Sequence, residues 1–196
     1  MTNVIDADVL FAPNDMGLRH LPEGPIAYGN GFSWVGIQHG NESMHGSLNL
    51  FDLRARANRS INLPGRPGFA FPTTDPDWFI AGIEKHVQLF QVSTGRCETV
   101  SDEIDQEVEN TLINDGIPFA DGIVFGAKDL EFQAKKAGLY LWRLDQSLVR
   151  LRDDQICSNG KVILPDGDQW QMLDIDSPTQ QVVRYRLDAI NGTMSD

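Results

Sequence analysis

Short turn-forming tags recur along this chain of 196 residues at an almost constant interval, and this repeat limits the fold more than any single residue does. The tags lie about 45 residues apart, a period typical of repeat architectures in which each repeat forms one β-propeller blade of four strands. They are Glu23-Gly24-Pro25, Arg66-Pro67-Gly68, Asn114-Asp115-Gly116 and Asn159-Gly160. The repeat therefore predicts an all-β fold, a β-propeller with about four blades.

Each repeat also holds two runs rich in aromatic and β-branched residues, and in several of them apolar and polar residues alternate. The first runs begin near Phe32, Trp78, Ile123 and Trp170, and the second runs begin near Leu48, Val87, Leu139 and Val182. Alternation of this kind is typical of half-buried strands. Turn formers such as Ser93-Thr94-Gly95 and Asp121-Gly122 separate the runs, whereas convincing helical patterns are scarce.

The repeats divide the chain into three parts. We expect an N-terminal segment at residues 1–20, a single propeller domain at 21–190 and a short tail at 191–196. The four blade repeats are expected at about 21–64, 65–109, 110–156 and 157–190.

Charge and composition exclude some classes of partner. The net charge of −12 at pH 7 argues against nucleic-acid binding, which needs clustered lysine and arginine, and against adhesion to anionic membranes. The first 21 residues lack a basic end followed by an apolar stretch, and no segment has the length and hydrophobicity of a membrane span. Cys97 and Cys157 lack metal-type spacing. We therefore expect a reduced, cytoplasmic protein.

The candidate chemistry lies at the tags. Segments that enter the innermost strand of each blade converge around a propeller axis, so oxygen atoms from different blades meet there. Glu23, Asn114 and Asn159 would supply one carboxylate and two amide carbonyls, a hard oxygen set suited to Ca²⁺, Mg²⁺ or Mn²⁺. The alternative is that Asn-Asp-Gly and Asn-Gly are ordinary turns, because Asn tolerates left-handed backbone and Gly adopts it freely.

Five segments occur in a recognisable order. They are Pro22-Glu23-Gly24-Pro25, Ile113-Asn114-Asp115-Gly116, Phe125-Gly126-Ala127-Lys128-Asp129, Gly138-Leu139-Tyr140 and Ser158-Asn159-Gly160. This combination resembles the regucalcin/gluconolactonase family, also called the senescence marker protein family, from about Leu21 to about Asp188. The resemblance implies a six-bladed β-propeller with a divalent cation at its axis, and hydrolysis of sugar lactones and related esters.

The resemblance also assigns roles to single residues. Glu23 and Asn159 match metal ligands of the family, and Asn114 matches an asparagine that lies close to the metal and contacts substrate. Glu131 matches an acidic residue that some members use to hold sugar hydroxyls, although a solvated loop residue is an equally good interpretation. The implied cofactor is one divalent cation, with Ca²⁺ expected first and Mg²⁺, Mn²⁺ or Zn²⁺ as alternatives.

The family mechanism needs a base that these 196 residues do not obviously provide. In the family the base is an aspartate in a Pro-Asp-Gly tag that begins the fifth blade, and this sequence ends before a fifth block. Pro165-Asp166-Gly167 looks like that tag, but its place between the fourth tag and the next run predicts a hairpin turn. Asp176, near the end of a predicted strand, remains as the candidate catalytic residue.

Two further positions depart from the family. Leu112 stands where many sugar-lactone members carry an arginine that grips the substrate, which indicates a different or less polar substrate. Gly36 replaces an aspartate that often follows the first Trp-Val pair.

Two functions remain open. The first is metal-dependent hydrolysis of a small-molecule lactone or ester, by metal polarisation of the carbonyl and attack of an activated water, in a hydrolase whose ring is completed. The alternative is a non-catalytic or truncated propeller fragment that binds a cation, a small molecule or a partner protein. Four blades shaped for six-fold closure leave two faces and sheet edges exposed, so we also expect self-association or a partner that covers them.

Overall fold

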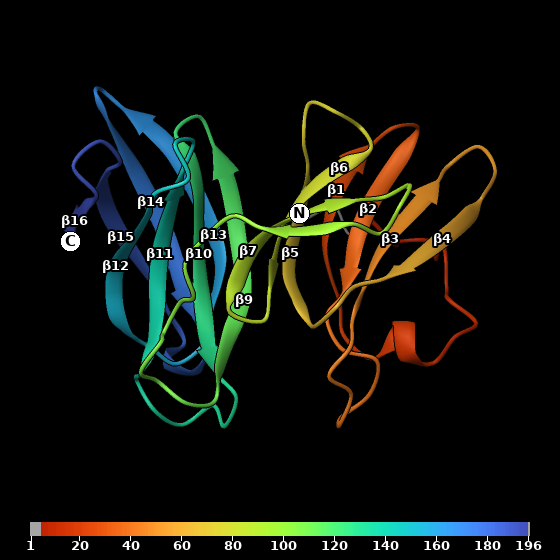
Figure 1. Cartoon of the computed structure of the whole chain (residues 1–196), viewed down its shortest axis with the longest axis horizontal. Helices are drawn as coiled ribbons and strands as arrows, with labels where there is room; N and C mark the ends of the chain where they lie inside the picture. Colours follow the sequence, from red (N-terminus) through yellow and green to blue (C-terminus); the bar gives the residue numbers. More distant parts are fainter. Residues whose placement is uncertain (1–4, 196) are drawn as a thin grey trace.

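Four separate antiparallel sheets, each of four strands, make up the protein (Figure 1). The structure is a computed structural model and describes residues 5–195; residues 1–4 of the expected N-terminal segment and residue 196 of the expected tail lie outside the described residues. In every sheet, strands that are consecutive in the chain are hydrogen-bonded neighbours. The expected all-β propeller with four blades is confirmed.

The first two blades follow the N-terminal segment, which contains the short 3₁₀ turn η1 (Gly17–Arg19). The first blade consists of β1 (Pro22–Tyr28), β2 (Gly31–Gly36), β3 (Ser47–Asp52) and β4 (Ala57–Asn62). The second consists of β5 (Pro67–Pro72), β6 (Trp78–Ile83), β7 (His86–Gln91) and β8 (Cys97–Thr99). A long connection then leads to the third blade.

The third blade consists of β9 (Thr111–Phe119), β10 (Gly122–Asp129), β11 (Ala137–Arg143) and β12 (Leu148–Gln155). The fourth consists of β13 (Ser158–Asp166), β14 (Gln169–Asp176), β15 (Gln181–Asp188) and β16 (Thr193–Ser195), with the 3₁₀ turn η2 (Ser177–Thr179) after β14. Strand β16 lies in the stretch where a tail was expected, because it pairs with β15 and completes the blade. Among the described residues both helices are 3₁₀ turns of three residues, too short to cross a membrane.

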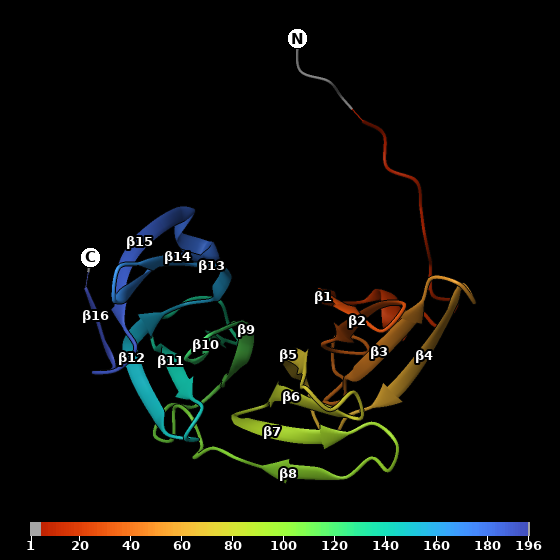
Figure 2. The same cartoon turned by 90° about the horizontal axis from the view of Figure 1, so that it is seen from above.

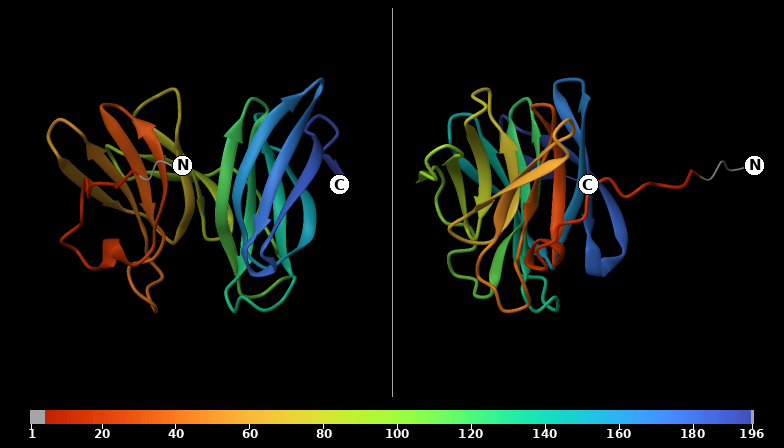
Figure 3. Two further views of the ribbon diagram at one scale, coloured as in Figure 1. Left: turned by 180° about the vertical axis from the view of Figure 1, so that it is seen from behind. Right: turned by 90° about the vertical axis from the view of Figure 1, so that its right-hand side faces the viewer.

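The blades form an arc around a common centre (Figure 2). Strands β1, β5, β9 and β13 lie on the inside of the arc, and the outermost strands β4, β8, β12 and β16 lie on its periphery. The arc is open between the fourth blade and the first, so the ring is incomplete. The first described residues of the N-terminal segment extend away from the blades (Figures 2 and 3), whereas Phe11 packs against Phe51 of the first blade.

Three hydrophobic clusters join successive blades. One contains Leu48 of the first blade and Phe79 of the second, and another joins the second blade to Phe125 of the third. The last joins Leu141 of the third blade to Met172 of the fourth. Each of these side chains is almost fully buried, which stabilises the fold by roughly 1.5–3 kcal/mol per large apolar residue.

Strand β10 shows how the sequence produces this packing. All eight of its residues are buried, and successive side chains point to opposite faces of the sheet. Ile123 and Phe125 therefore join the cluster shared with the second blade, whereas Val124 joins the cluster shared with the fourth. The aromatic and β-branched first run of this repeat is thus a strand covered on both sides.

The tags lie at β-bulges rather than in turns or entry loops. In β1 the pairing register shifts between Glu23 and Ile26, and corresponding shifts occur at the tags of β5, β9 and β13. Gly24 and Gly160 adopt φ angles of +57° and +47°, a left-handed conformation that favours glycine. A bulge bends the strand and re-aims its side chains, and such bulges often lie beside active sites.

A buried pair of polar side chains fixes the connection between the second and third blades. The Tyr140 hydroxyl donates to Asp105 Oδ1 at 2.6 Å and accepts from the Asp105 backbone N–H at 3.0 Å. Burial, together with the Asp105 carboxylate, raises the pKa of Tyr140 above its usual value, so the hydroxyl stays a donor.

Replacing this hydroxyl tests its contribution to stability. We expect Tyr140→Phe to lower the free energy of unfolding by about 1–3 kcal/mol, because the buried Asp105 carboxylate loses its hydroxyl donor and keeps only the Gly138 amide. The matched control is Tyr28→Phe, whose hydroxyl donates to the Pro76 carbonyl at an exposed edge and whose loss should cost less than about 1 kcal/mol. Urea denaturation measures both, and equal losses in the two variants would contradict the interpretation.

Candidate functional site

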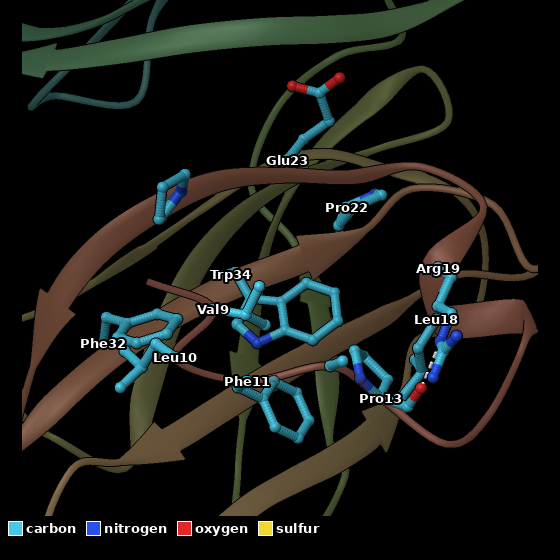
Figure 4. A pocket seen from close by; sticks show the side chains of 12 residues that line it. Val9, Leu10, Phe11, Pro13, Leu18, Arg19, Pro22, Glu23, Phe32 and Trp34 are labelled. Atoms are coloured by element: carbon cyan, nitrogen blue, oxygen red, sulfur yellow. Dashed lines mark hydrogen bonds between the residues drawn. The ribbon is translucent and has the colours of Figure 1, made fainter. Parts of the chain in front are cut away.

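Glu23 projects from the bulge of β1 toward the centre of the arc. Figure 4 shows its carboxylate turned away from the first blade's apolar side chains and toward the ribbon of the third blade. Among residues 5–195 it makes no hydrogen bond or ion pair. Burial, and next the nearby Asp115 carboxylate, raise the pKa of Glu23, while Lys128 opposes them. The negative charge of Glu23 is therefore only partly balanced by positive charge nearby.

Asn114 and Asp115 occupy the bulge of β9 and link the third blade to the fourth. Asn114 Nδ2 donates to the Ser158 carbonyl at 3.0 Å, and Asn114 Oδ1 accepts no hydrogen bond within the described chain. Asp115 Oδ1 accepts from the Gly116 backbone N–H at 2.8 Å. The side-chain amide of Asn114 is therefore held by β13 with its oxygen still available.

Asn159 follows Ser158 directly and lies at the bulge of β13. Its Oδ1 accepts from the Gly160 backbone N–H at 3.0 Å, and its Nδ2 donates to Ser177 Oγ at 3.4 Å. A carbonyl oxygen has two lone pairs, so one remains. We call Glu23, Asn114, Asp115 and Asn159 the axial site, because they lie at the bulges of innermost strands in a series in which each strand contacts the next, from the first blade to the fourth.

Two buried lysines accompany the axial site. The side chain of Lys161 has no exposed surface, and its Nζ lies 3.7 Å from Asp115 Oδ2 and 3.5 Å from Asp174 Oδ1 without a hydrogen bond to either. Burial raises the pKa of Asp174, and Lys161 opposes that rise. Lys128, at the end of β10, is also buried. The lysine charges partly balance the two carboxylates of the axial site.

Asp176 is turned toward the main chain. Its Oδ1 accepts from the Cys157 backbone N–H at 2.7 Å and its Oδ2 from the Ile156 backbone N–H at 3.2 Å. The carboxylate therefore holds the crossing from the third blade to the fourth. Asp166 is exposed beside the hairpin turn between β13 and β14, as the sequence indicated.

Asp129 organises the loop that contains Glu131. The buried Asp129 carboxylate accepts hydrogen bonds from three loop amides and forms an ion pair with Lys136 at 3.1 Å. Glu131 itself is exposed, and its Oε1 accepts from Asn110 Nδ2 at 3.5 Å. Both interpretations of Glu131, as a substrate contact and as a solvated loop residue, are compatible with this position.

A cavity of about 500 Å³ lies beside the axial site on the first blade (Figure 4). The N-terminal segment covers it with Leu10 and Phe11, and the blade contributes Phe32 and Trp34. Glu23 lies at its border but points elsewhere. The cavity is thus an apolar space separate from the converging polar groups.

The available donors restrict the chemistry. Within residues 5–195 no three His, Cys, Asp or Glu side chains come together as a metal cluster, so a cation in the axial site would depend on amide oxygens besides Glu23. Burial raises the pKa of Cys157 to about 11, which keeps this thiol protonated and a poor nucleophile.

The comparisons with known proteins concern the family and the fold. A family model described as the SMP-30/Gluconolactonase/LRE-like region matches residues 21–196. The chain belongs to this family. The expected resemblance is confirmed, and the four blades are those of a six-bladed, lactonase-type propeller.

This member of the SMP-30/gluconolactonase family matches only part of the length of its individual relatives. It is 29% identical over 164 residues to a putative sugar lactone lactonase, YvrE, of Bacillus subtilis (strain 168), which is 83% of this chain and 53% of the relative. The chain thus spans about half of that protein.

Solved structures share its fold. A calcium-binding protein, regucalcin, from Agrobacterium tumefaciens superposes with a TM-score of 0.73 at 18% identity, over 90% of this chain and 57% of that one. A luciferin-regenerating enzyme gives 0.75 at 16% identity, over 93% and 61%.

Sequence reasoning missed both lysines of this family member. Lys161 directly follows the Asn159-Gly160 tag, and Lys128 lies within a strongly apolar run. A lysine inside a strand that is covered on both faces was the available signal, because such a residue cannot be solvated in the usual way.

The Asp129 loop gives a pH-dependent prediction. Burial raises the pKa of Asp129, but the loop hydrogen bonds and Lys136 outweigh it and hold the pKa well below the usual value. Stability from this group is therefore complete above the unfolded pKa of about 3.9 and is lost as the pH falls through the folded pKa.

We expect Asp129→Asn to lower the free energy of unfolding by about 1–2 kcal/mol at pH 7, with a smaller difference from the unmodified protein below pH 4. Asp153→Asn, at an exposed position of β12, is the matched control. Urea denaturation at pH 7 and pH 3 measures both variants. A loss for Asp129→Asn that is the same at both pH values would contradict this explanation.

Proposed function

We propose that the axial site hydrolyses a lactone or related ester with the help of one divalent cation, Ca²⁺ being the expected ion. Glu23 and Asn159 are the proposed ligands, and Asn114 is the proposed substrate contact. The observation that carries the proposal is the Glu23 carboxylate, which is open to solvent, has no hydrogen bond or ion pair with residues 5–195, and is repelled by a second carboxylate at Asp115. Family membership supports the substrate class.

The donor chemistry fits a hard cation. Repulsion between Glu23 and Asp115 contributes to the raised pKa of Glu23, and a bound cation would relieve it. Asn114 Oδ1 is free of hydrogen bonds from described residues, and Asn159 Oδ1 keeps a lone pair. One carboxylate and two amide oxygens are ligands that Ca²⁺ and Mg²⁺ prefer, and Mn²⁺ and Zn²⁺ are also compatible with them.

When bound, a divalent cation would polarise the ester carbonyl and stabilise the oxyanion. The chain's own groups would position the substrate. Asn114, held by the Ser158 carbonyl, has a second amide hydrogen free to donate to a substrate oxygen. Asp176 was the sequence candidate for the base, but both of its oxygens accept main-chain hydrogen bonds. Asp115, beside Glu23, is the better-placed base among these blades.

A non-catalytic role is the second candidate. The engagement of Asp176 by the main chain favours it, since the same oxygen cluster would then bind a cation or small molecule without an activated water. Both candidate functions use the axial site and a cation, so a measurement of lactone turnover is needed to distinguish hydrolysis from binding alone.

Turnover and cation binding by variants test the proposal. We expect Glu23→Gln and Asn159→Ala to weaken cation binding and to lower kcat/KM for sugar and aliphatic lactones by about 100-fold or more, because the carbonyl loses its electrostatic stabilisation. Glu42→Gln and Asn41→Ala, both exposed on one loop, are the matched controls.

Calorimetric titration with Ca²⁺ and Mn²⁺ and a lactone hydrolysis assay measure the two effects separately. Cation binding that Glu23→Gln abolishes, without turnover in the unmodified protein, would favour the binding function. Turnover that neither EDTA nor Glu23→Gln reduces would contradict the metal-dependent proposal.

A further inference from the structure

Lys128 is a largely buried residue whose ammonium group has no hydrogen-bond or ion-pair partner among residues 5–195. The residue is 8% exposed, and its Nζ makes no hydrogen bond or ion pair with any residue from 5 to 195, although it has three donors. Burial lowers the pKa of Lys128 from its usual value. Its Nζ is not among the fully buried atoms without a hydrogen bond, so a ligand can reach it, and a ligand carboxylate would stabilise this partly desolvated charge.

The surrounding carboxylates are already engaged or lie too far away. Glu84 accepts two hydrogen bonds from the Arg66 guanidinium, at 2.9 and 2.8 Å. Asp129, next in sequence, is occupied by its loop amides and Lys136. Glu23 attracts Lys128 electrostatically but does not come within the 4.0 Å of an ion pair.

The other cations near the axial site are paired. Arg66 is held by Glu84, and Lys161 lies between Asp115 and Asp174. Lys128 is thus the buried cation of this group whose charge no carboxylate within ion-pair distance balances. An isolated β-bridge pairs Lys128 with Cys157, next to the first residue of β13, and Glu23 and Arg66 are near enough to influence its charge.

One aromatic wall borders the ammonium. Lys128 Nζ lies 5.8 Å from the centroid of the Phe132 ring, which belongs to the loop that Asp129 holds. Phe132 is 52% exposed, so its ring also faces the solvent from which a ligand would arrive. On the neighbouring strand, Leu112 pairs with Lys128 and offers no competing polar group.

We propose that Lys128 binds the carboxylate of a hydroxycarboxylate ligand at the axial end of the arc. The ammonium donates to the carboxylate oxygens, and the amide of Asn114 and the ring of Phe132 contact the rest of the molecule. The further identification of this ligand as the open-chain acid that lactone hydrolysis yields rests on the proposed function. The binding of the carboxylate does not.

A pair of matched probes tests the inference. D-gluconate carries a carboxylate, and D-glucitol is a neutral polyol of the same length. Isothermal titration with each probe, with and without Ca²⁺, compares the unmodified protein with Lys128→Met, Lys128→Arg and Lys135→Met. Lys135→Met removes the same charge from an exposed position of the neighbouring loop.

We expect gluconate to bind more tightly than glucitol, and Lys128→Met to weaken gluconate binding about 10-fold or more, as the loss of a charged hydrogen bond predicts. Lys128→Arg should retain part of the preference, and Lys135→Met should change nothing. Thermal melts of Lys128→Met should show no loss of stability, because the variant removes an unpaired buried charge.

Two results would overturn the inference: equal affinity of the unmodified protein for both probes, or gluconate binding that Lys128→Met leaves unchanged. The lactone assay separates this inference from the proposed function. Gluconate binding that depends on Lys128, without lactone turnover, would support the inference and count against the enzyme. Lactone turnover without a preference for gluconate over glucitol would support the enzyme and overturn the inference about Lys128.

Discussion

Close packing of the four innermost strands around one axis determines where the polar groups of this protein lie. At Gly68 of β5 an added Cβ would lie 2.5 Å from the Ile113 carbonyl of β9, so only glycine allows the two strands to approach this closely. The bulges then turn the side chains of Glu23, Asn114 and Asn159 out of the regular alternation. The axial site is therefore a property of the strand packing and not of flexible loops.

Most of the charged side chains near the axial site are paired with one another. Asp115 and Asp174 share the buried Lys161, and Glu84 is paired with Arg66. Glu23 and Lys128 remain without an ion-pair partner among residues 5–195. At longer range, Lys128 lowers the pKa of Glu23 and Glu23 raises the pKa of Lys128. The roles proposed for them, cation binding by Glu23 and anion binding by Lys128, would suit a ligand with a polarisable carbonyl and a carboxylate.

Much of the fold could be predicted from the sequence, because alternation and turn formers recur in every repeat. The runs that begin near Phe32 and Leu48 are strands β2 and β3, and later repeats follow the same order. The tags were expected in turns, yet they form bulges, since the left-handed glycines that permit a turn also permit a bulge.

Other features depended on three-dimensional packing that no local pattern reveals. Strand β16 follows a turn beyond the last recognised repeat and forms by pairing with β15. Lys161 looks like a solvated residue in the sequence, and only the strands packed around it show that it is buried, whereas Lys128 had the local signal of an apolar run. The main-chain hydrogen bonds of Asp176 likewise depend on the crossing between two blades.

If the innermost strands bring Asn114 and Asn159 to one cation-binding point with Glu23, a paramagnetic cation will affect these residues together. Paramagnetic broadening by substoichiometric Mn²⁺, followed in the side-chain amide signals of a ¹⁵N-labelled sample, tests it most directly. The account predicts that the Asn114 and Asn159 signals broaden together, that Asn41 stays sharp, and that Glu23→Gln removes the effect. Broadening confined to Asn and Gln side chains next to exposed acidic residues, with Asn114 and Asn159 unaffected, would contradict it.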